Sequence, residues 1–275
     1  PWVHEVPLAD DYRGLFRRGE PDIGRKFAAT VAAAMDRAAD RGRRCAAFIA
    51  ETLPSVGGQI VLPPGYLAEV YRHVRARGAL CIADEVQVGF GRLGESFWGF
   101  ETQAVVPDIV VLGKPIANGF PLGAVVTSRE IAAAFDNGME FFSTCGGNPV
   151  ACAAGLAVLD VLDGEGLQEN ARQRGKQLLR GLQALHARHP IVGDARGMGL
   201  FQGLELVRDR DTLEPAAREA AYVVERLRDK HILCGTDGPL HNVVKIRPPM
   251  VIEEGDIELL LETLDLALGE TQFLP

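Results

Sequence analysis

Two apolar runs of the chain each end in a charged residue, and this arrangement constrains the fold more than any other feature of the sequence. One run, ALCIAD, ends at Asp84, and the other, IVVLGK, ends at Lys114. Short continuous apolar runs are typical of strands that are buried on both faces of a parallel sheet. Because parallel strands end at a common edge, we expect Asp84 and Lys114 at the edge where α/β proteins place their active sites.

Helices and strands alternate in the first half of the chain. Apolar residues with helical spacing predict helices at 21–44, 63–78 and 129–138, and apolar runs predict strands at 45–51, 79–85, 107–114 and 121–128. The strand at 45–51 ends at Glu51. This alternation predicts an α/β fold with a mostly parallel sheet sandwiched by helices.

The pattern changes near residue 150. A long helical stretch at 148–189 is interrupted near Gly164–Gly166, and the segments after it predict strands at 199–207 and 242–249 and helices at 214–232 and 253–270. This is an α+β pattern that is segregated from the first half. We therefore expect a large domain over 1–155 and a smaller carboxyl-terminal domain over 156–275.

Composition limits the kinds of partner that the protein can have. The 275 residues include 29 Lys plus Arg against 37 Asp plus Glu, a net charge of -8 that favours neither nucleic acid nor an anionic membrane. No run approaches the roughly 18 apolar residues of a membrane span, and we expect a cytoplasmic protein. The five cysteines form no C-x-x-C pair, so no metal site is expected.

A lysine and an aspartate at one sheet edge are the two groups that pyridoxal 5′-phosphate requires. The lysine amine can form a Schiff base with the cofactor aldehyde, and the aspartate can keep the pyridine nitrogen protonated. Lys114 and Asp84 therefore predict this cofactor and an amine substrate. The alternatives are a solvated surface lysine and an aspartate that caps the turn after its strand.

Four motifs of the chain resemble a known family in sequence and in order. They are IADEVQVGFGR, LGKPIANGFPLGA, STCGGNPVACAAGLAVLDVL and VKIRPPM. The chain resembles the class III aminotransferases of the fold type I pyridoxal-phosphate transferases over essentially its whole length. Within that family it is most similar to the branch of ethanolamine-phosphate phospho-lyase and 5-phosphohydroxy-lysine phospho-lyase.

The resemblance implies roles for the residues at the predicted sheet edge. Lys114 would hold the cofactor and move the substrate proton, Asp84 would bind the pyridine nitrogen, and Gln87 would contact the phenolic oxygen of the cofactor. Glu51 would lie near the cofactor and the substrate amine. The alternatives are a solvated turn residue for Gln87 and a surface carboxylate for Glu51.

Two further positions match family residues in the second part of the chain. Thr144, in STCGGNP, would reach the cofactor phosphate of the other subunit, which implies a homodimer; the alternative is a simple glycine-containing loop. Arg247, in KIRPP, would bind a substrate carboxylate through its guanidinium fork, and the alternative is a surface ion pair.

The chain departs from the family at its amino end. Family members carry a further segment there, with a Gly/Ser-rich turn that cradles the cofactor phosphate and an aromatic residue that stacks on its ring. This chain begins with Pro1 rather than Met. We expect it to be part of a longer polypeptide, and to bind cofactor weakly or not at all on its own.

Three functions remain open from the sequence. We expect first an aminotransferase that moves an amino group between an amine or amino acid and a carbonyl acceptor. The second is a phospho-lyase that eliminates phosphate from O-phosphoethanolamine or a related phosphorylated amine, because Lys114, Asp84 and Gln87 serve both reactions and Arg247 could accept phosphate. The third is a catalytically silent regulatory homologue, which has no need for the intact residue set.

Overall fold

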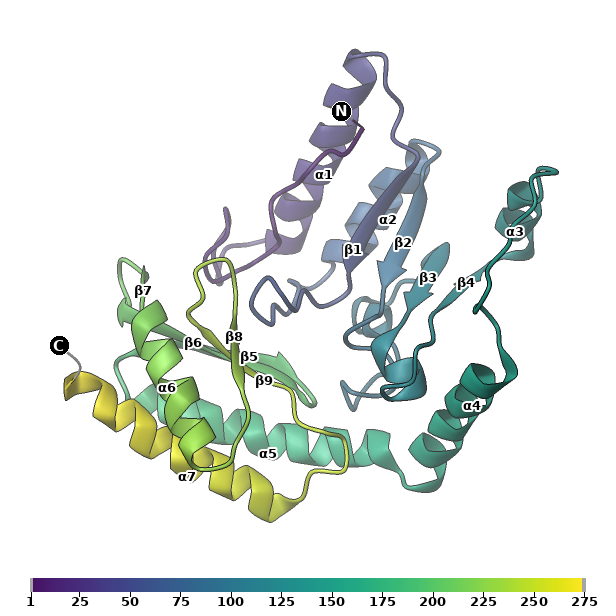
Figure 1. Cartoon of the computed structure of the whole chain (residues 1–275). Helices are drawn as coiled ribbons and strands as arrows, with labels where there is room; N and C mark the ends of the chain where they lie inside the picture. The colour runs from purple at the N-terminus through teal and green to yellow at the C-terminus, as the bar shows by residue number, and fades with distance from the viewer. Residues whose placement is uncertain (1, 274–275) are drawn as a thin grey trace.

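The computed structural model describes residues 2–273, which form two separate β-sheets with helices packed against them (Figure 1). The first sheet has the order β1-β2-β3-β4, with β1 at Ala47–Glu51, β2 at Leu80–Asp84, β3 at Ile109–Leu112 and β4 at Ala124–Thr127. β1, β2 and β3 are parallel, and β4 pairs antiparallel with β3. The predicted mostly parallel sheet is confirmed, and its four strands fall within the apolar runs of the sequence.

Helices α1 (Ile23–Asp40) and α2 (Tyr66–Ala76) lie side by side on one face of this sheet (Figure 1). Their apolar residues pack together with Cys81 of β2, and the fully buried members include Phe27, Val70 and Val74. On β1, Ile49 is 61% exposed. The helices therefore cover the first sheet unequally within the described chain.

The second sheet is antiparallel and has the order β5-β6-β9-β8, with a short β7 on β6. Its strands are β5 at Val192–Met198, β6 at Phe201–Asp209, β7 at Glu214–Pro215, β8 at Gly235–Asp237 and β9 at Val243–Ile246. Three helices supply the apolar side chains that cover one of its faces: α5 at Leu167–Arg188, α6 at Ala217–Asp229 and α7 at Glu254–Glu270. The predicted α+β character of this part is confirmed.

Helix α3 (Arg129–Phe135) follows β4, and α4 (Pro149–Gly164) precedes α5 (Figure 1). The predicted interruption of the long helical stretch is confirmed, because α4 ends at Gly164 and Gly166 has a left-handed φ of 61° before α5 begins. The domain boundary near residue 155 stays a prediction.

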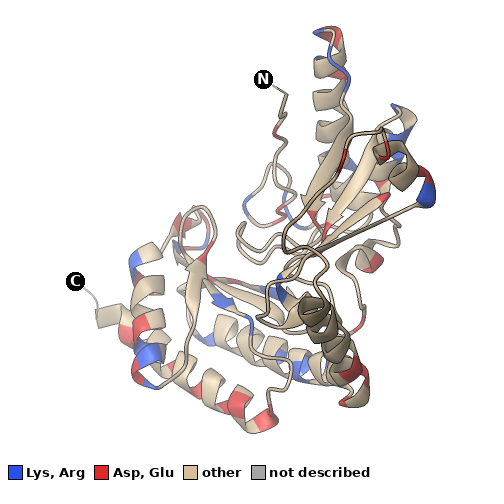
Figure 2. Ribbon diagram, turned by 45° about the vertical axis from the view of Figure 1, so that its right-hand side comes forward, with Lys and Arg blue, Asp and Glu red and all other residues tan. Residues whose placement is uncertain are grey.

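A small apolar cluster joins the two sheets. Leu53, Val88 and Leu93 from loops of the first sheet pack on Phe201 of β6. At the same contact, a Cβ on Gly199 would lie 2.4 Å from the backbone carbon of Leu93, so only glycine permits this approach. Figure 2 shows the two sheets approaching each other near the middle of the molecule.

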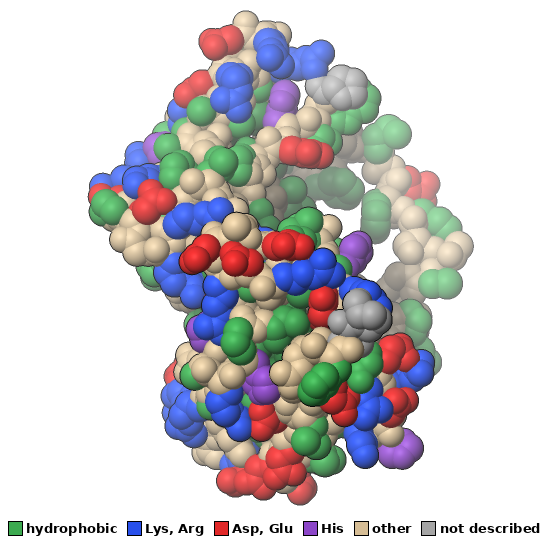
Figure 3. Space-filling view, turned by 90° about the vertical axis from the view of Figure 1, so that its left-hand side faces the viewer, with side chains coloured by type: hydrophobic (Ala, Val, Ile, Leu, Met, Phe, Trp, Pro, Cys, Tyr) green, Lys and Arg blue, Asp and Glu red, His purple; other side chains and the backbone are tan. Residues whose placement is uncertain are grey.

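Charged side chains are mixed on the surface. Figure 3 shows acidic and basic side chains interspersed on one face of the molecule, without a continuous basic stripe. Among residues 2–273, no helix is both long enough and apolar enough to cross a bilayer.

Candidate active site

Three strand ends of the first sheet bring the predicted residues to one edge. Glu51 is the register partner of Asp84, and Asp84 is the register partner of Val111. Lys114 follows two residues after the end of β3. The chain therefore places Glu51, Asp84 and Lys114 at the carboxyl edge of parallel strands, as the apolar runs predicted.

Lys114 begins a short 3-10 helix, η2 (Lys114–Ala117), with an unusual backbone conformation. Its φ is 36°, in the left-handed region, and Gly113 before it is extended. A left-handed conformation costs a residue with a Cβ atom about 1–2 kcal/mol, and strained residues of this kind cluster at active sites. The Lys114 side chain is exposed, and no hydrogen bond or ion pair reaches it within residues 2–273. Its amine is available to a ligand.

Asp84 is half-buried and uses one of its two carboxylate oxygens. Its Oδ1 accepts a hydrogen bond from the backbone N–H of Val86 at 2.9 Å, which fixes the turn after β2. The described chain supplies no cationic partner for this carboxylate. Asp84 thus caps the turn after its strand, as the alternative interpretation of the sequence suggested. Its Oδ2 is still available to a cation.

Gln87 carries a polar atom that the chain does not satisfy. Its Oε1 is buried and has no hydrogen-bond partner among the described residues. Burying such a group without a partner costs about 1–3 kcal/mol, and turning the amide over would only exchange its oxygen for its nitrogen. The Gln87 amide therefore fits a ligand with a polar group at this position.

A cavity of about 590 Å³ lies between the first sheet's edge and the second sheet. Gln87 and Lys114 line it from one side, and Arg247, which follows β9, lines it from the other. Its apolar lining includes Ile246 and Leu260. Three predicted site residues that are distant in the sequence thus share one cavity, whereas Asp84, Glu51 and Thr144 are outside its lining.

Arg247 is a half-buried cation without a partner. No hydrogen bond or ion pair joins it to another residue of the described chain, which argues against the surface ion pair considered from the sequence. Burial lowers the pKa of Arg247, and the opposing charge of Asp237 raises it by less. A guanidinium in this setting is stabilised by an anionic ligand.

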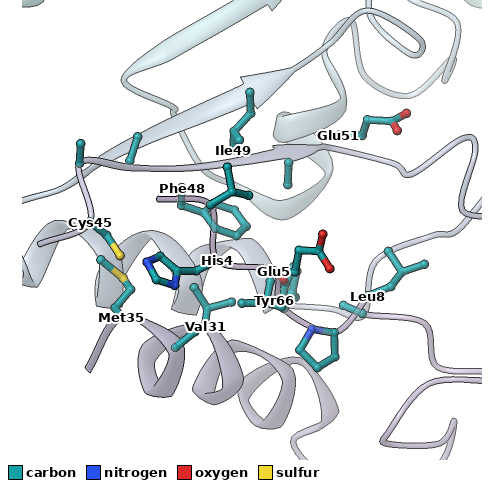
Figure 4. Close-up of a pocket in the computed structure, with 18 of the residues that line it drawn as sticks. His4, Glu5, Leu8, Val31, Met35, Cys45, Phe48, Ile49, Glu51 and Tyr66 are labelled. Atoms are coloured by element: carbon teal, nitrogen blue, oxygen red, sulfur yellow. The ribbon is translucent and has the colours of Figure 1, made fainter. Parts of the chain in front are cut away.

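Glu51 faces a different cavity. Its Oε2 accepts a hydrogen bond from the backbone N–H of Ser55 at 3.0 Å. It lines a larger hollow of about 1050 Å³ between residues 2–9, α1 and β1, where Figure 4 shows His4, Val31 and Phe48 among the lining side chains. This hollow holds none of the other predicted site residues.

Thr144 lies in the segment between α3 and α4 and is exposed. Within the described chain it is not brought to Lys114 or to the cavity. Its predicted role toward a second subunit stays a prediction.

Glu85 is a residue of this edge that the sequence analysis missed. It is completely buried and accepts hydrogen bonds from Thr52 Oγ1 at 2.9 Å, from Gly99 N at 2.8 Å and from Phe100 N at 2.9 Å. Burial raises the pKa of Glu85, and these donors oppose the rise. Glu85 ties the ends of β1 and β2 to the 3-10 helix η1 (Gly99–Gln103). A charged residue directly after Asp84 was the available signal.

Comparison with known proteins identifies the family. The class III aminotransferase family model matches residues 2–268. An alanine–glyoxylate aminotransferase 2-like protein of Drosophila melanogaster is 47% identical over 254 residues, which are 90% of this chain and 51% of that protein. Ethanolamine-phosphate phospho-lyase homolog 1 of Caenorhabditis elegans is 40% identical over 97% of this chain and 60% of its own length.

Solved structures give the same result. A phospholyase from Arthrobacter in complex with phosphoethanolamine superposes with a TM-score of 0.88 at 39% identity and covers 93% of this chain and 60% of that chain. A Bacillus anthracis aminotransferase superposes with a TM-score of 0.87 at 35% identity, over 96% of this chain and 61% of its own. The chain thus spans about half to three fifths of the length of these relatives.

These findings confirm the predicted resemblance and the fold class. Class III aminotransferases and their phospho-lyase relatives are pyridoxal-phosphate enzymes, which confirms the predicted cofactor at the level of the family. The chain belongs to the class III aminotransferase family.

Proposed function

We propose that the polypeptide containing this chain is a pyridoxal-phosphate-dependent aminotransferase. One observation carries the proposal: Lys114, Gln87 and the partnerless Arg247 converge on one cavity beside the strand edge that holds Asp84. An amino-acid substrate and its cofactor need three groups in one place: an amine that binds the cofactor aldehyde, a polar contact and a group that binds an anion.

The residues present fit the cofactor. Gln87 has a buried amide oxygen without a partner, and Asp84 has one carboxylate oxygen that the described chain does not use. When bound, pyridoxal phosphate supplies an electron-accepting ring that stabilises negative charge on the amine-bearing carbon of the substrate. Asp84 would hold a proton at the pyridine nitrogen, and Gln87 would contact the phenolic oxygen.

Lys114 would hold the cofactor and then transfer the substrate proton. Its amine is exposed and is not engaged by a carboxylate of the described chain, so it is free to react with the cofactor aldehyde. In its neutral form it would accept a proton from the substrate carbon and deliver it again. Arg247 would orient the substrate by binding its carboxylate from across the cavity. Glu51, two strands from Lys114, would act on the substrate amine from the edge of the sheet.

A phospho-lyase is the second candidate. The same residues would remove the substrate proton, and the reaction would then release phosphate from the neighbouring carbon instead of moving the amino group. The nematode phospho-lyase homolog and the Arthrobacter phospholyase support this reading. In the phospho-lyase reaction, Arg247 would bind the phosphate group of the substrate.

One experiment separates the candidates. The full polypeptide, loaded with cofactor, is mixed with O-phosphoethanolamine, and inorganic phosphate is measured beside a Lys114→Ala control. Phosphate released only by the unmodified protein would establish the phospho-lyase. No phosphate, together with conversion of the cofactor absorbance when L-alanine is added, would establish the aminotransferase. Activity that is unchanged in Lys114→Ala would contradict both. Neither phosphate release nor conversion of the cofactor absorbance by the unmodified protein would leave the regulatory homologue.

We infer that the protein works as a homodimer. The segment that carries Thr144 has two large exposed apolar side chains just before it: Phe141 is 77% exposed and Phe142 is 76% exposed. Exposed apolar residues continue onto α4 at Val150 and Leu156. Such a patch is typical of a protein interface, and a second copy seated on it would receive Thr144 near its own cofactor. Sedimentation of the unmodified polypeptide and of Phe142→Asp measures this association.

We infer a cytosolic location, because no run of the sequence approaches the roughly 18 apolar residues of a membrane span. Relatives from Arabidopsis thaliana and Homo sapiens carry the word mitochondrial in their names. Cell fractionation of the full polypeptide decides between the two compartments.

A further inference from the structure

Glu85 joins the ends of strands β1 and β2 one residue beyond the two carboxylates Glu51 and Asp84. Its Oε1 accepts a hydrogen bond from Oγ1 of Thr52 at 2.9 Å, and Thr52 directly follows Glu51. The backbone N–H of Thr52 also donates to the carbonyl of Asp84, at the longer distance of 3.4 Å. Thr52 therefore contacts both the peptide bond that links Asp84 to Glu85 and the side chain that follows it.

The same peptide bond is held by the strand on its other side. The N–H of Glu85 donates to the carbonyl of Val111 at 3.0 Å, and Val111 is the register partner of Asp84 on β3. Beyond the pairing of the strands, the end of β2 is thus fixed to β3 by one backbone hydrogen bond and to β1 by Thr52. A change at Thr52 would act on the backbone of Asp84 without touching its carboxylate.

The 3-10 helix η1 binds the carboxylate of Glu85 and packs against the turn that carries Gln87. The N–H of Gly99, at the start of η1, donates to Glu85 at 2.8 Å. The adjacent Trp98 packs edge-on against Phe90, with 5.1 Å between the ring centroids. Phe90 and Gln87 belong to one turn, at 86–90. Glu85 is therefore connected to both of the residues that the proposed function places on the cofactor ring.

Glu85 is a buried carboxylate without a cation. Its side chain is fully buried, no ion pair reaches it within residues 2–273, and the charge that bears on it is that of another carboxylate, Glu101. Its hydrogen-bond partners are all donors, which favours the ionised form. A neutral side chain could connect two loops without the cost of burying a charge. Costly buried groups of this kind cluster at active sites, and Glu85 is adjacent to Asp84.

We propose that Glu85 and Thr52 are positioning residues for the reaction, which hold Asp84 in the place that its interaction with the pyridine nitrogen of the cofactor requires. Neither side chain needs to touch the cofactor or the substrate. A displacement of about 1 Å at a reacting group can lower a rate about 10²-fold, so the loss of one hydroxyl that fixes the strand end can be measured. The inference rests on the proposed function, because that function assigns Asp84 its role.

Two forms of the cofactor test the proposal through binding rather than catalysis. Pyridoxal phosphate and its 1-deaza analogue, in which a C–H group replaces the pyridine nitrogen, are titrated into the cofactor-free full polypeptide and into Thr52→Val. This substitution keeps the shape of the side chain but removes the hydroxyl. We expect Thr52→Val to bind pyridoxal phosphate at least about 10-fold more weakly, and the analogue less than about twofold more weakly. Thr52→Ser restores the hydroxyl and should recover most of the affinity.

Thr263→Val is the matched control. Thr263 is a buried threonine of α7, and its Oγ1 donates to the carbonyl of Leu259 at 2.7 Å, far from the end of β2 in the fold. Thr263→Val should change the affinity for neither ligand. Glu85→Gln is a second test variant, for use if Thr52→Val does not fold. It keeps the size of the side chain but turns an NH₂ group toward backbone donors, and it should weaken pyridoxal phosphate more than the analogue.

Two results would overturn the proposal. One is an unchanged affinity for pyridoxal phosphate in Thr52→Val, and the other is an equal loss for both ligands, since the pair would then support the site without acting through Asp84. In an Asp84→Asn background, Thr52→Val should weaken pyridoxal phosphate by less than about twofold, and a larger further loss would also contradict the proposal. Catalysis that persists in Lys114→Ala refutes the proposed function instead, and it leaves these ratios of binding constants unaffected.

Discussion

Glu51 and Asp84 are register partners at the ends of two parallel strands, and each uses one carboxylate oxygen to accept a backbone N–H of the turn that follows it. The two carboxylates thus fix the turns that leave the sheet. Neither second oxygen accepts a hydrogen bond from the described residues. Structural and chemical roles are therefore combined in the same side chains, and the following predictions separate them.

Replacement of Lys114 by Ala should remove catalysis without loss of stability. The side chain is exposed and makes no hydrogen bond or ion pair within residues 2–273, so its removal costs no packing. Loss of a group that transfers a proton typically lowers the rate by at least about 10²-fold. Steady-state rates and thermal unfolding of the full polypeptide measure the two effects. Lys176→Ala, at an exposed ion pair with Glu95, should change neither.

Asp84→Asn should slow catalysis and leave the fold intact. Asn retains an oxygen that can accept the N–H of Val86, so the turn after β2 is kept, but it cannot balance a protonated pyridine nitrogen. We expect kcat to fall by roughly 10²-fold or more, with a change in the free energy of unfolding of less than about 1 kcal/mol. A loss of stability as large as that of Asp84→Ala would contradict the separation of the two roles.

Asp194 should make stability depend on pH in the acid range. It is buried and pairs with Arg18 and Arg196 at 3.0 Å each, while Arg196 also pairs with the buried Glu205. Burial alone would raise the pKa of Asp194, but the two arginines outweigh it and hold the pKa below 3.8. Its folded pKa is thus below its unfolded pKa, so its stabilisation is present above pH 3.8 and is lost as the pH falls through the folded pKa.

Asp194→Asn tests this pH dependence. At pH 7 the variant should be less stable by about 3 kcal/mol, because the buried Arg196 and the exposed Arg18 lose a charged partner. Urea unfolding at pH 7 and at pH 3 should show a smaller difference between the proteins at pH 3. If the difference in the free energy of unfolding between the two proteins grows toward low pH, the predicted direction of the pH dependence is wrong.

Gly199→Ala should destabilise the junction of the two sheets. The added methyl group would lie 2.4 Å from the backbone of Leu93, and Gly199 has a left-handed φ of 50°. Such overpacking costs about 1–3 kcal/mol. Gly255, near the start of α7, has open space at its Cβ position, so Gly255→Ala should stabilise the protein by roughly 0.5 kcal/mol through helix propensity. Chemical denaturation of both variants gives the comparison.

The first sheet could be predicted because its strands are buried and their apolar residues are continuous. Asp84 and Lys114 stood out at the ends of such runs, and the structure brings both to one edge. The second sheet was harder to predict from the sequence. Strand β5 has the sequence VGDARGM, whose charged residues and glycines hide its strand character. Its Asp194 and Arg196 are buried as a pair, and Arg196 also pairs with Glu205 on β6.

The ion pair of Lys245 could not be predicted for a related reason. Its neighbour Arg247 was visible in a family motif, whereas the partner of Lys245 is Asp237, which lies next to it only after β8 and β9 pair. Glu85 likewise is buried as an acceptor of hydrogen bonds from Thr52 and from the backbone of Gly99, which are distant in the sequence. Side chains whose role depends on tertiary neighbours carry little local signal.

The hydrogen bond from Gln59 to Asp237 joins a loop of the first sheet to the second sheet. Gln59 follows β1, and Asp237 lies on β8, where it also pairs with Lys245. A ligand that binds more tightly to one relative orientation of the two sheets must favour that orientation by the same free energy, because the two equilibria are linked.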